Sequence, residues 1–254
     1  MSRSNLFGGE TPRYFFLFST ISFFWSLYMR DLSIHVDESG DFGDYSSKFA
    51  PYYIFSLVFH EQCNDISDSI LRLDTEMAKL GFLSYVIHTG PLIRKEEVYC
   101  NLPPNDRRAI FSRLYYFVIS IPIRYKTFDV ARKEYPDAVS LRNRIHLLLS
   151  RFFENNLPYF LSFDRIILYY DNGQSELSQV LLFSLQEKFS SLIRKSNVHQ
   201  YQYKLLQAAD MLCTLRLLEI KAKNNSLSKS ELCVFHSAKE LRKDFLKRIK
   251  EKEF

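Results

Sequence analysis

The sequence has little of what would define a metal–cysteine, disulfide-rich or low-complexity protein. Its four cysteines are widely spaced and form no CxxC pair. This excludes a zinc ribbon or a disulfide framework and indicates free thiols in a reducing compartment such as the cytoplasm. The 254 residues include only seven Gly and eight Pro, with no internal repeat and no long low-complexity linker. These absences leave an ordinary globular protein as the expectation.

The composition predicts a bulky apolar core and a mildly basic surface. Hydrophobic residues make up 46% of the chain, and the aromatic residues include 23 Phe and 16 Tyr. The formal net charge of +5 is compatible with a nucleic-acid partner and does not require one. The length suits one large domain with an appendage.

One long apolar run, residues 14–29 (YFFLFSTISFFWSLYM), precedes the rest of the chain. It has about 15 apolar residues, whereas a membrane-spanning helix needs about 20, and it lacks a small-residue cleavage site, so no stable membrane insertion is expected. Three interpretations stay open. Met29 is the true start and residues 1–28 are an over-extended translation; or residues 1–28 are a hydrophobic or disordered extension; or they are a signal or anchor. In each case residues 29–254 form the expected domain.

Hydrophobic periodicity predicts strands that alternate with helices, as in an α/β domain with a mixed sheet. Strands are expected at residues 32–37, 51–60, 121–131, 164–171 and 198–203, with 82–88 as a strand or extended segment. Helices are expected at residues 64–80, 176–192, 205–224 and 228–254, and from about residues 103 and 140 onward.

Carboxylates follow two of these predicted strands. Asp37 and Glu38 end the first strand, before a turn that contains Asp41, and Asp171 ends the strand at residues 164–171. Burying a carboxylate costs several kcal/mol unless it is paired or binds a cation. Ligands of open α/β sheets bind beyond the carboxyl ends of strands, so Asp37 and Asp171 would be adjacent if their strands are parallel neighbours. Asp171-Asn172-Gly173 taken alone is equally typical of a simple turn.

Asp210 is the third carboxylate, in a predicted helix that is apolar nearly all round and therefore buried. Alone, it could be satisfied by the backbone or by an arginine. Together, Asp37, Asp171 and Asp210 have the character of a ligand set for one or two Mg²⁺ or Mn²⁺ ions, which prefer carboxylate and water oxygens. Two such ions can activate a water and stabilise the leaving oxygen of a phosphodiester.

The motifs VDESGDFG (36–43), YYDNG (169–173) and KLLQAADMLC (204–213), in this order, resemble the uncharacterised DUF3800 family, which is grouped with the ribonuclease H-like fold. The resemblance covers about residues 30–250. It implies a five-stranded mixed sheet with helices on both sides, here followed by a C-terminal helical extension. It also implies that Asp37, Asp171 and Asp210 correspond to the metal-binding acidic residues of ribonuclease H-like nucleases.

Other residues are auxiliary candidates. Glu38 points away from Asp37 on a regular strand and joins the site only if the strand has begun to turn. His88 is either a proton relay near the metal ions or a packed histidine. Arg94 and Lys95 could hold a phosphate of nucleic acid or simply be exposed. Asp41 is expected to be a solvated turn residue.

The leading hypothesis is therefore a metal-dependent nuclease, with Asp37, Glu38, His88, Asp171 and Asp210 as catalytic candidates. The alternative is a non-catalytic ribonuclease H-like binding module, for example in phage defence or mobile-element biology. A phosphatase that uses Asp37 as nucleophile is weakly supported, since such enzymes need a second Asp where this chain has Ser39. Protein partners cannot be inferred from the sequence.

Overall fold

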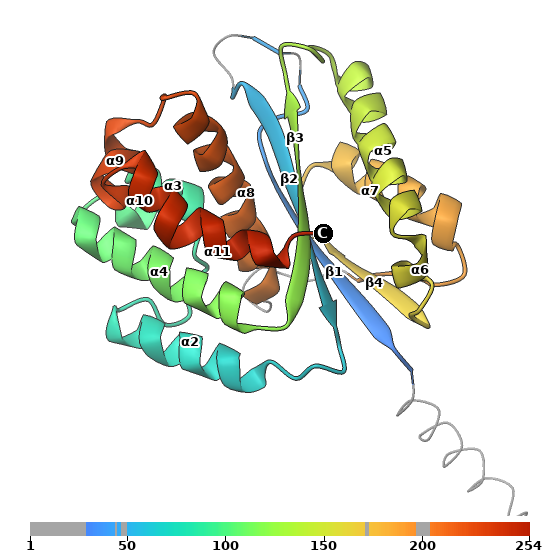
Figure 1. Ribbon diagram of the computed structural model, residues 1–254, viewed down its shortest axis with the longest axis horizontal. Coiled ribbons are helices and arrows are strands. Elements are labelled where there is room, and N and C mark those ends of the chain that lie inside the picture. The colour runs from blue at the N-terminus through green and yellow to red at the C-terminus, as the bar shows by residue number, and fades with distance from the viewer. Residues whose placement is uncertain (1–28, 44, 47–49, 171–172, 197–203) are drawn as a thin grey trace, which may run out of the picture.

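A five-stranded mixed sheet lies between two layers of helices (Figure 1). The computed structural model describes residues 29–43, 45–46, 50–170, 173–196 and 204–254. The expectations for residues 1–28 and the predicted strand at 198–203 thus fall outside it. The strands are β1 (Asp31–Ser39), β2 (Tyr52–Glu61), β3 (Ile123–Ala131), β4 (Arg165–Tyr170) and the short β5 (Ile193–Ser196).

The strand order is β3-β2-β1-β4-β5. The pairs β1–β2 and β2–β3 are antiparallel, whereas β1–β4 and β4–β5 are parallel. This confirms the predicted α/β class with a mixed sheet. The edge strand β5 was not predicted; it lies between the helix expected at residues 176–192 and the strand expected at residues 198–203. Residues 82–88 form no strand, because Ser84 adopts a left-handed conformation (φ 68°) that interrupts extended backbone.

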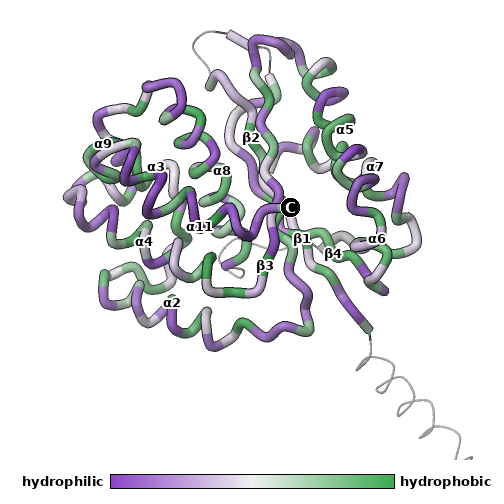
Figure 2. Tube along the Cα trace, viewed as in Figure 1, coloured by the Kyte–Doolittle hydropathy of each residue, from purple (hydrophilic) through white to green (hydrophobic). Residues whose placement is uncertain are grey.

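Helices cover both faces of the sheet, as the sequence predicts. One layer consists of α5 (Ala138–Asn155), α6 (Leu157–Phe160) and α7 (Ser175–Phe189). The other contains α2 (Ser67–Lys79), α3 (Thr89–Arg94), α4 (Pro104–Ser120) and α8 (Lys204–Lys223), followed by α9 (Lys229–Phe235), α10 (Ala238–Leu241) and α11 (Lys247–Ile249). Figure 2 shows hydrophilic and hydrophobic residues interspersed along these helices, as expected when one side of each packs on the sheet.

Each face of β1 packs against a different layer. Leu32, Ile34 and Val36 point into the apolar cluster that β1 shares with α5 and α7. His35 points the other way and is stacked on Tyr169, with ring centroids 4.7 Å apart. Burial, with a smaller contribution from His60, lowers the pKa of His35 to about 3, so this imidazole is neutral at physiological pH. Asp37, two residues further along β1, lies on the same face of the strand as His35.

The C-terminal segment is not the single helix expected at residues 228–254. The predicted cap is present, because Ser228 and Glu231 form a reciprocal capping box. The helix then ends at His236, which takes a φ of 61°. Short helices follow, with buried residues that complete the core against α4 and α8. The chain ends against the sheet, where the Phe254 N–H donates to the Tyr125 carbonyl at 3.0 Å. The segment is therefore an integral part of the domain.

None of the helices within the described ranges is both long and apolar enough to span a membrane.

The turn after β1 depends on Gly40. Its φ of +116° is disfavoured for other residues, and a Cβ there would lie 2.9 Å from the Tyr52 carbonyl oxygen. We expect Gly40→Ala to lower the free energy of unfolding by about 3 kcal/mol, from backbone strain plus this clash. Gly81→Ala is the matched control, since Gly81 has φ +79° and open space around it. Its expected cost is only about 1 kcal/mol. Urea denaturation measures both, and equal costs would contradict the role of the Tyr52 contact.

Candidate functional site

The parallel strands β1 and β4 lie next to each other up to the residue that precedes a predicted acidic position on each. β1 and β4 are paired in parallel, and Val36 lies opposite Tyr170. These are the residues that immediately precede Asp37 and Asp171. Asp171 itself lies outside the described residues, so its side chain is not placed. Asp37 is half-buried and is paired with Ser56 on the antiparallel side of β1.

Helix α8 carries Asp210 to the carboxyl end of β1 as well. One turn after Asp210, the Cys213 thiol contacts β1 and β2, with Sγ 3.3 Å from the Asp37 carbonyl oxygen and 3.2 Å from Ser56 Oγ. Burial raises the pKa of Cys213, and the nearby negative charges of Asp37, Asp210 and Glu38 raise it further. The Cys213 thiol therefore lies within electrostatic reach of all three carboxyl groups.

Asp210 is held by the first residue of α3. Both the backbone N–H and the hydroxyl of Thr89 donate to Asp210 Oδ2, at 2.7 and 2.6 Å. Burial raises the pKa of this carboxyl group, whereas the two Thr89 hydrogen bonds and the charges of His88 and Arg94 oppose the increase; the net change is upward. His88 is half-buried and directly precedes α3. The charge of His88 therefore acts on Asp210 from the segment whose next residue, Thr89, donates hydrogen bonds to the Asp210 carboxyl group.

Glu38 is still part of the regular β1 ladder, opposite Phe55, and its side chain reaches the start of α7. Its Oε1 accepts the backbone N–H of Gln174 at 3.1 Å. Its Oε2 is buried and has no hydrogen-bond partner among the residues that the structure describes. Burial raises the pKa of Glu38, and the hydrogen bonds from Gln174 and Tyr170 only partly oppose this. A buried carboxylate oxygen without a donor is costly unless the group is protonated or binds a cation.

Glu38 and Asp210 line a common cleft of about 280 Å³. Ser39, from the turn after β1, and Thr214, from α8, are also at its wall. The cleft contains two basic side chains as well. Arg94 forms an ion pair with Glu96 (2.8 Å), and Lys221 forms one with Glu231 (2.7 Å), which also lines the cleft.

The remaining sequence candidates lie elsewhere. Lys95 is exposed, takes a left-handed conformation at the end of α3, and is not among the residues of the cleft wall. Asp41 is an exposed turn residue whose Oδ1 accepts the Gly43 N–H at 2.8 Å, as the sequence predicts. Along the described parts of the chain, no group of three or more His, Cys, Asp or Glu side chains is arranged to hold a metal ion. The predicted ligand set includes Asp171, which is outside those parts.

Gln174 and Thr89 shape the site and were not identified from the sequence. The Gln174 side chain donates to the Gly40 carbonyl (2.8 Å) and accepts the Phe42 N–H (2.9 Å), which fastens the turn after β1 to the start of α7. Gly173 completes this contact, since a Cβ there would lie 2.7 Å from Glu38 Oε1. In the sequence, Gln174 could have been noticed only because it precedes a predicted helix, and Thr89 only because it follows His88.

No protein-family model matches the chain, and no curated protein matches it. Among solved structures, the chain is similar to a chain of the PCNA:RNase HII complex from Archaeoglobus fulgidus, with 15% identity over 78% of this chain and 81% of the other. The TM-score of 0.38 is too low to carry an argument about fold family or function. The resemblance to the DUF3800 family thus rests on the three sequence motifs alone.

The raised pKa values of Glu38 and Asp210 make their charges a cost to folding. A group whose pKa is higher in the folded state contributes stability below its unfolded pKa and loses it as the pH rises through the folded value. At pH 7, in EDTA, we therefore expect Glu38→Gln and Asp210→Asn each to increase the free energy of unfolding by roughly 0.5–2 kcal/mol. The amide oxygens can still accept the hydrogen bonds from Gln174 and Thr89.

Urea denaturation at pH 7 and at pH 3 tests this expectation. The gain should shrink at pH 3, where the wild-type carboxyl groups are protonated. Asp41→Asn is the matched control in the same region: its side chain is exposed and keeps its bond to Gly43, so no gain is expected. If Glu38→Gln and Asp210→Asn are both less stable than the wild type at pH 7, the charges of these carboxyl groups do not destabilise the folded state.

Proposed function

We propose that this protein is a Mg²⁺- or Mn²⁺-dependent nuclease that hydrolyses phosphodiester bonds. The observation that carries the proposal is that Glu38, the neighbour of Asp37 at the carboxyl end of β1, lines one cleft with Asp210 and has a buried oxygen that lacks a donor among the described residues. Like charges gathered in a cleft call for a balancing cation, and the nearest protein groups to Asp210 Oδ2 are the neutral donors of Thr89.

The donors present suit a hard divalent cation. They are carboxylate oxygens, which Mg²⁺ and Mn²⁺ prefer over nitrogen or sulfur ligands. Asp37, Asp171 and Asp210 would hold one or two ions, with Glu38 as an additional ligand or outer partner. Asp171 enters the proposal through the register of its neighbour Tyr170 with Val36. A bound ion would supply a nucleophilic water at neutral pH and stabilise charge on the leaving oxygen.

Arg94, which lines the cleft, and three residues near it have roles that follow from their contacts. Thr89 fixes the orientation of Asp210 through two hydrogen bonds, and Gln174 fixes Glu38 and the turn after β1. Arg94 lines the cleft with a side chain that is about half exposed, so its guanidinium group can exchange Glu96 for a substrate phosphate. The charge of His88 acts on Asp210, so His88 is the candidate to accept or return a proton.

Nuclease activity with Mn²⁺ on DNA, RNA and hybrid substrates is the first test. We expect Asp37→Ala and Asp210→Ala to lower the cleavage rate at least about 100-fold, since a metal ion contributes several kcal/mol of transition-state stabilisation. The control is Asp41→Asn, which removes a nearby charge without touching the cleft and should cleave at the wild-type rate. Equal activity in wild type and both alanine variants would refute the assignment.

Calorimetry with Mn²⁺ separates the nuclease from a non-catalytic binding module. We expect binding in the micromolar range to the wild-type protein and its loss in Asp171→Ala and Asp210→Asn, because each removes a charged oxygen ligand. Thr89→Val should weaken Mn²⁺ binding through the freed Asp210 side chain, whereas Thr75→Val, which removes an exposed hydroxyl on α2, should not. An absence of Mn²⁺ binding by the wild-type protein would favour the binding module.

A further inference from the structure

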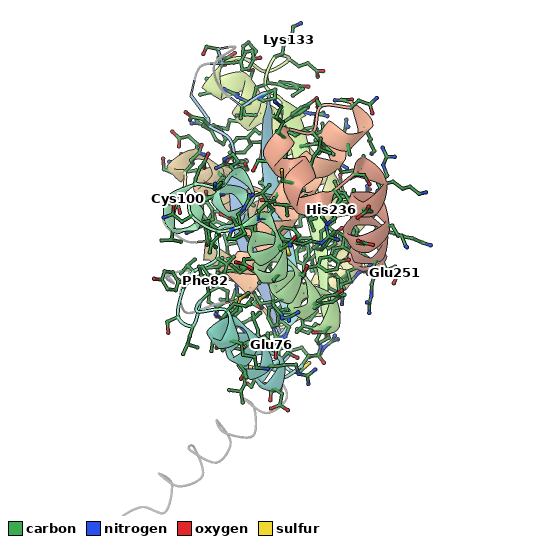
Figure 3. All side chains as sticks on the ribbon, turned by 90° about the vertical axis from the view of Figure 1, so that its left-hand side faces the viewer. Glu76, Phe82, Cys100, Lys133, His236 and Glu251 are labelled. Atoms are coloured by element: carbon green, nitrogen blue, oxygen red, sulfur yellow. The ribbon has the colours of Figure 1, made fainter. Side chains whose placement is uncertain are left out.

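A second cavity, which is lined by basic residues, lies between α2 and α4, away from the cleft of Glu38 and Asp210. Its volume is about 280 Å³, and Arg72 of α2, Arg113 of α4 and Arg248 of α11 all line it. Figure 3 faces this layer of the molecule and labels Glu76, the one acidic residue of the cavity wall, on α2 beside α4. Three elements that are far apart in the sequence thus place guanidinium groups around one hollow.

Among the residues that the structure describes, the protein neutralises only one of the three arginines. Glu76 forms ion pairs with Arg113 (3.0 Å) and with Lys79. Within the described parts of the chain, neither Arg72 nor Arg248 forms an ion pair, and both are exposed. Counting only the wall, three arginines against one glutamate leave a charge of +2. Burial lowers the pKa of Lys252, and the charge of Arg248 lowers it further, which is a second sign of excess positive potential here.

The rest of the wall suits phosphate better than a simple counterion. Ser69 and Ser120 add hydroxyl groups, and Tyr116 adds an aromatic ring that is 56% exposed. Guanidinium forks match phosphate oxygens in pairs, and an exposed ring can stack on a base. A binding partner with several phosphates would engage Arg72 and Arg248 together, each through a separate phosphate group.

We propose that this cavity, lined by Arg72, Arg113, Arg248 and Tyr116, binds a phosphate-bearing polyanion: either the backbone of a single-stranded nucleic acid or a free polyphosphate. The proposal does not depend on the carboxylate site, because none of these residues lines the cleft of Glu38 and Asp210. It goes beyond the proposed hydrolysis by assigning a separate place where the phosphates of a ligand are held.

Fluorescence anisotropy with a labelled 12-nucleotide oligothymidylate, in EDTA and low salt, measures the binding. Arg72→Gln and Arg248→Gln lie on exposed helix surfaces and should fold normally, which thermal unfolding checks. We expect the double variant to bind at least tenfold more weakly. The slope of log K against log salt should decrease by about 0.7 for each arginine that contacts a phosphate. Arg151→Gln is the matched control: it removes one exposed arginine from α5, on the opposite face of the sheet, and should change affinity less than twofold.

Competitors identify the source of the phosphates. Displacement of the oligonucleotide by inorganic tripolyphosphate supports a site for free polyphosphates; binding of the oligonucleotide alone, weakened by Tyr116→Ala, supports a nucleic-acid strand. Two results would overturn the proposal. One is equal affinity of the double variant and Arg151→Gln. The other is displacement by oligoglutamate of equal charge as effective as that by tripolyphosphate, which would indicate an acidic-peptide site. Because EDTA removes divalent ions, failure of the metal site leaves these results unchanged.

Discussion

Helix α8 packs directly on β1 and β2 through small side chains, and its Cys213 thiol meets the Asp37 carbonyl oxygen at 3.3 Å. Ala208 and Ala209 are fully buried in the same layer, so the helix can approach the sheet closely. This contact sets the depth of α8 over the sheet and thereby places Asp210 at the end of β1. The parallel pairing of β1 with β4 then decides which residues share that edge.

Ionisation of the carboxyl groups at this site is unfavourable in the folded protein. Asp37, Glu38 and Asp210 act on the same buried thiol, and burial raises the pKa of Glu38 and Asp210. Neutral donors from Thr89 and Gln174 orient two of the carboxyl groups without cancelling their charge. Purely structural carboxylates in this protein are treated differently: burial alone would raise the pKa of Glu219, but hydrogen bonds from Lys250, Lys223 and Arg216 outweigh it and lower that pKa to about 2. The contrast is that basic side chains surround Glu219, whereas the hydrogen bonds from Gln174 to Glu38 and from Thr89 to Asp210 come from neutral donors.

The two helical layers contribute unequally to these features. The layer of α2–α4 and α8–α11 contains Arg94 and Asp210 of the cleft and also the three arginines of the second cavity. The α5–α7 layer contributes Gln174, at the start of α7, to the turn after β1.

The sequence by itself determined the α/β class, most strands and helices, and the candidate Asp37 and Asp210, because periodicity and an acidic residue on an apolar element are local signals. It could not determine that Glu38 would line the cleft with Asp210, since strand alternation places the Glu38 side chain on the face opposite Asp37. The sequence also did not predict the helix break at His236. Three features join residues that are far apart in the chain: the Thr89–Asp210 hydrogen bonds, the Gln174 contacts, and the cavity shared by Arg72, Arg113 and Arg248. Tertiary packing alone decided these, because no short-range pattern encodes which distant side chains become neighbours.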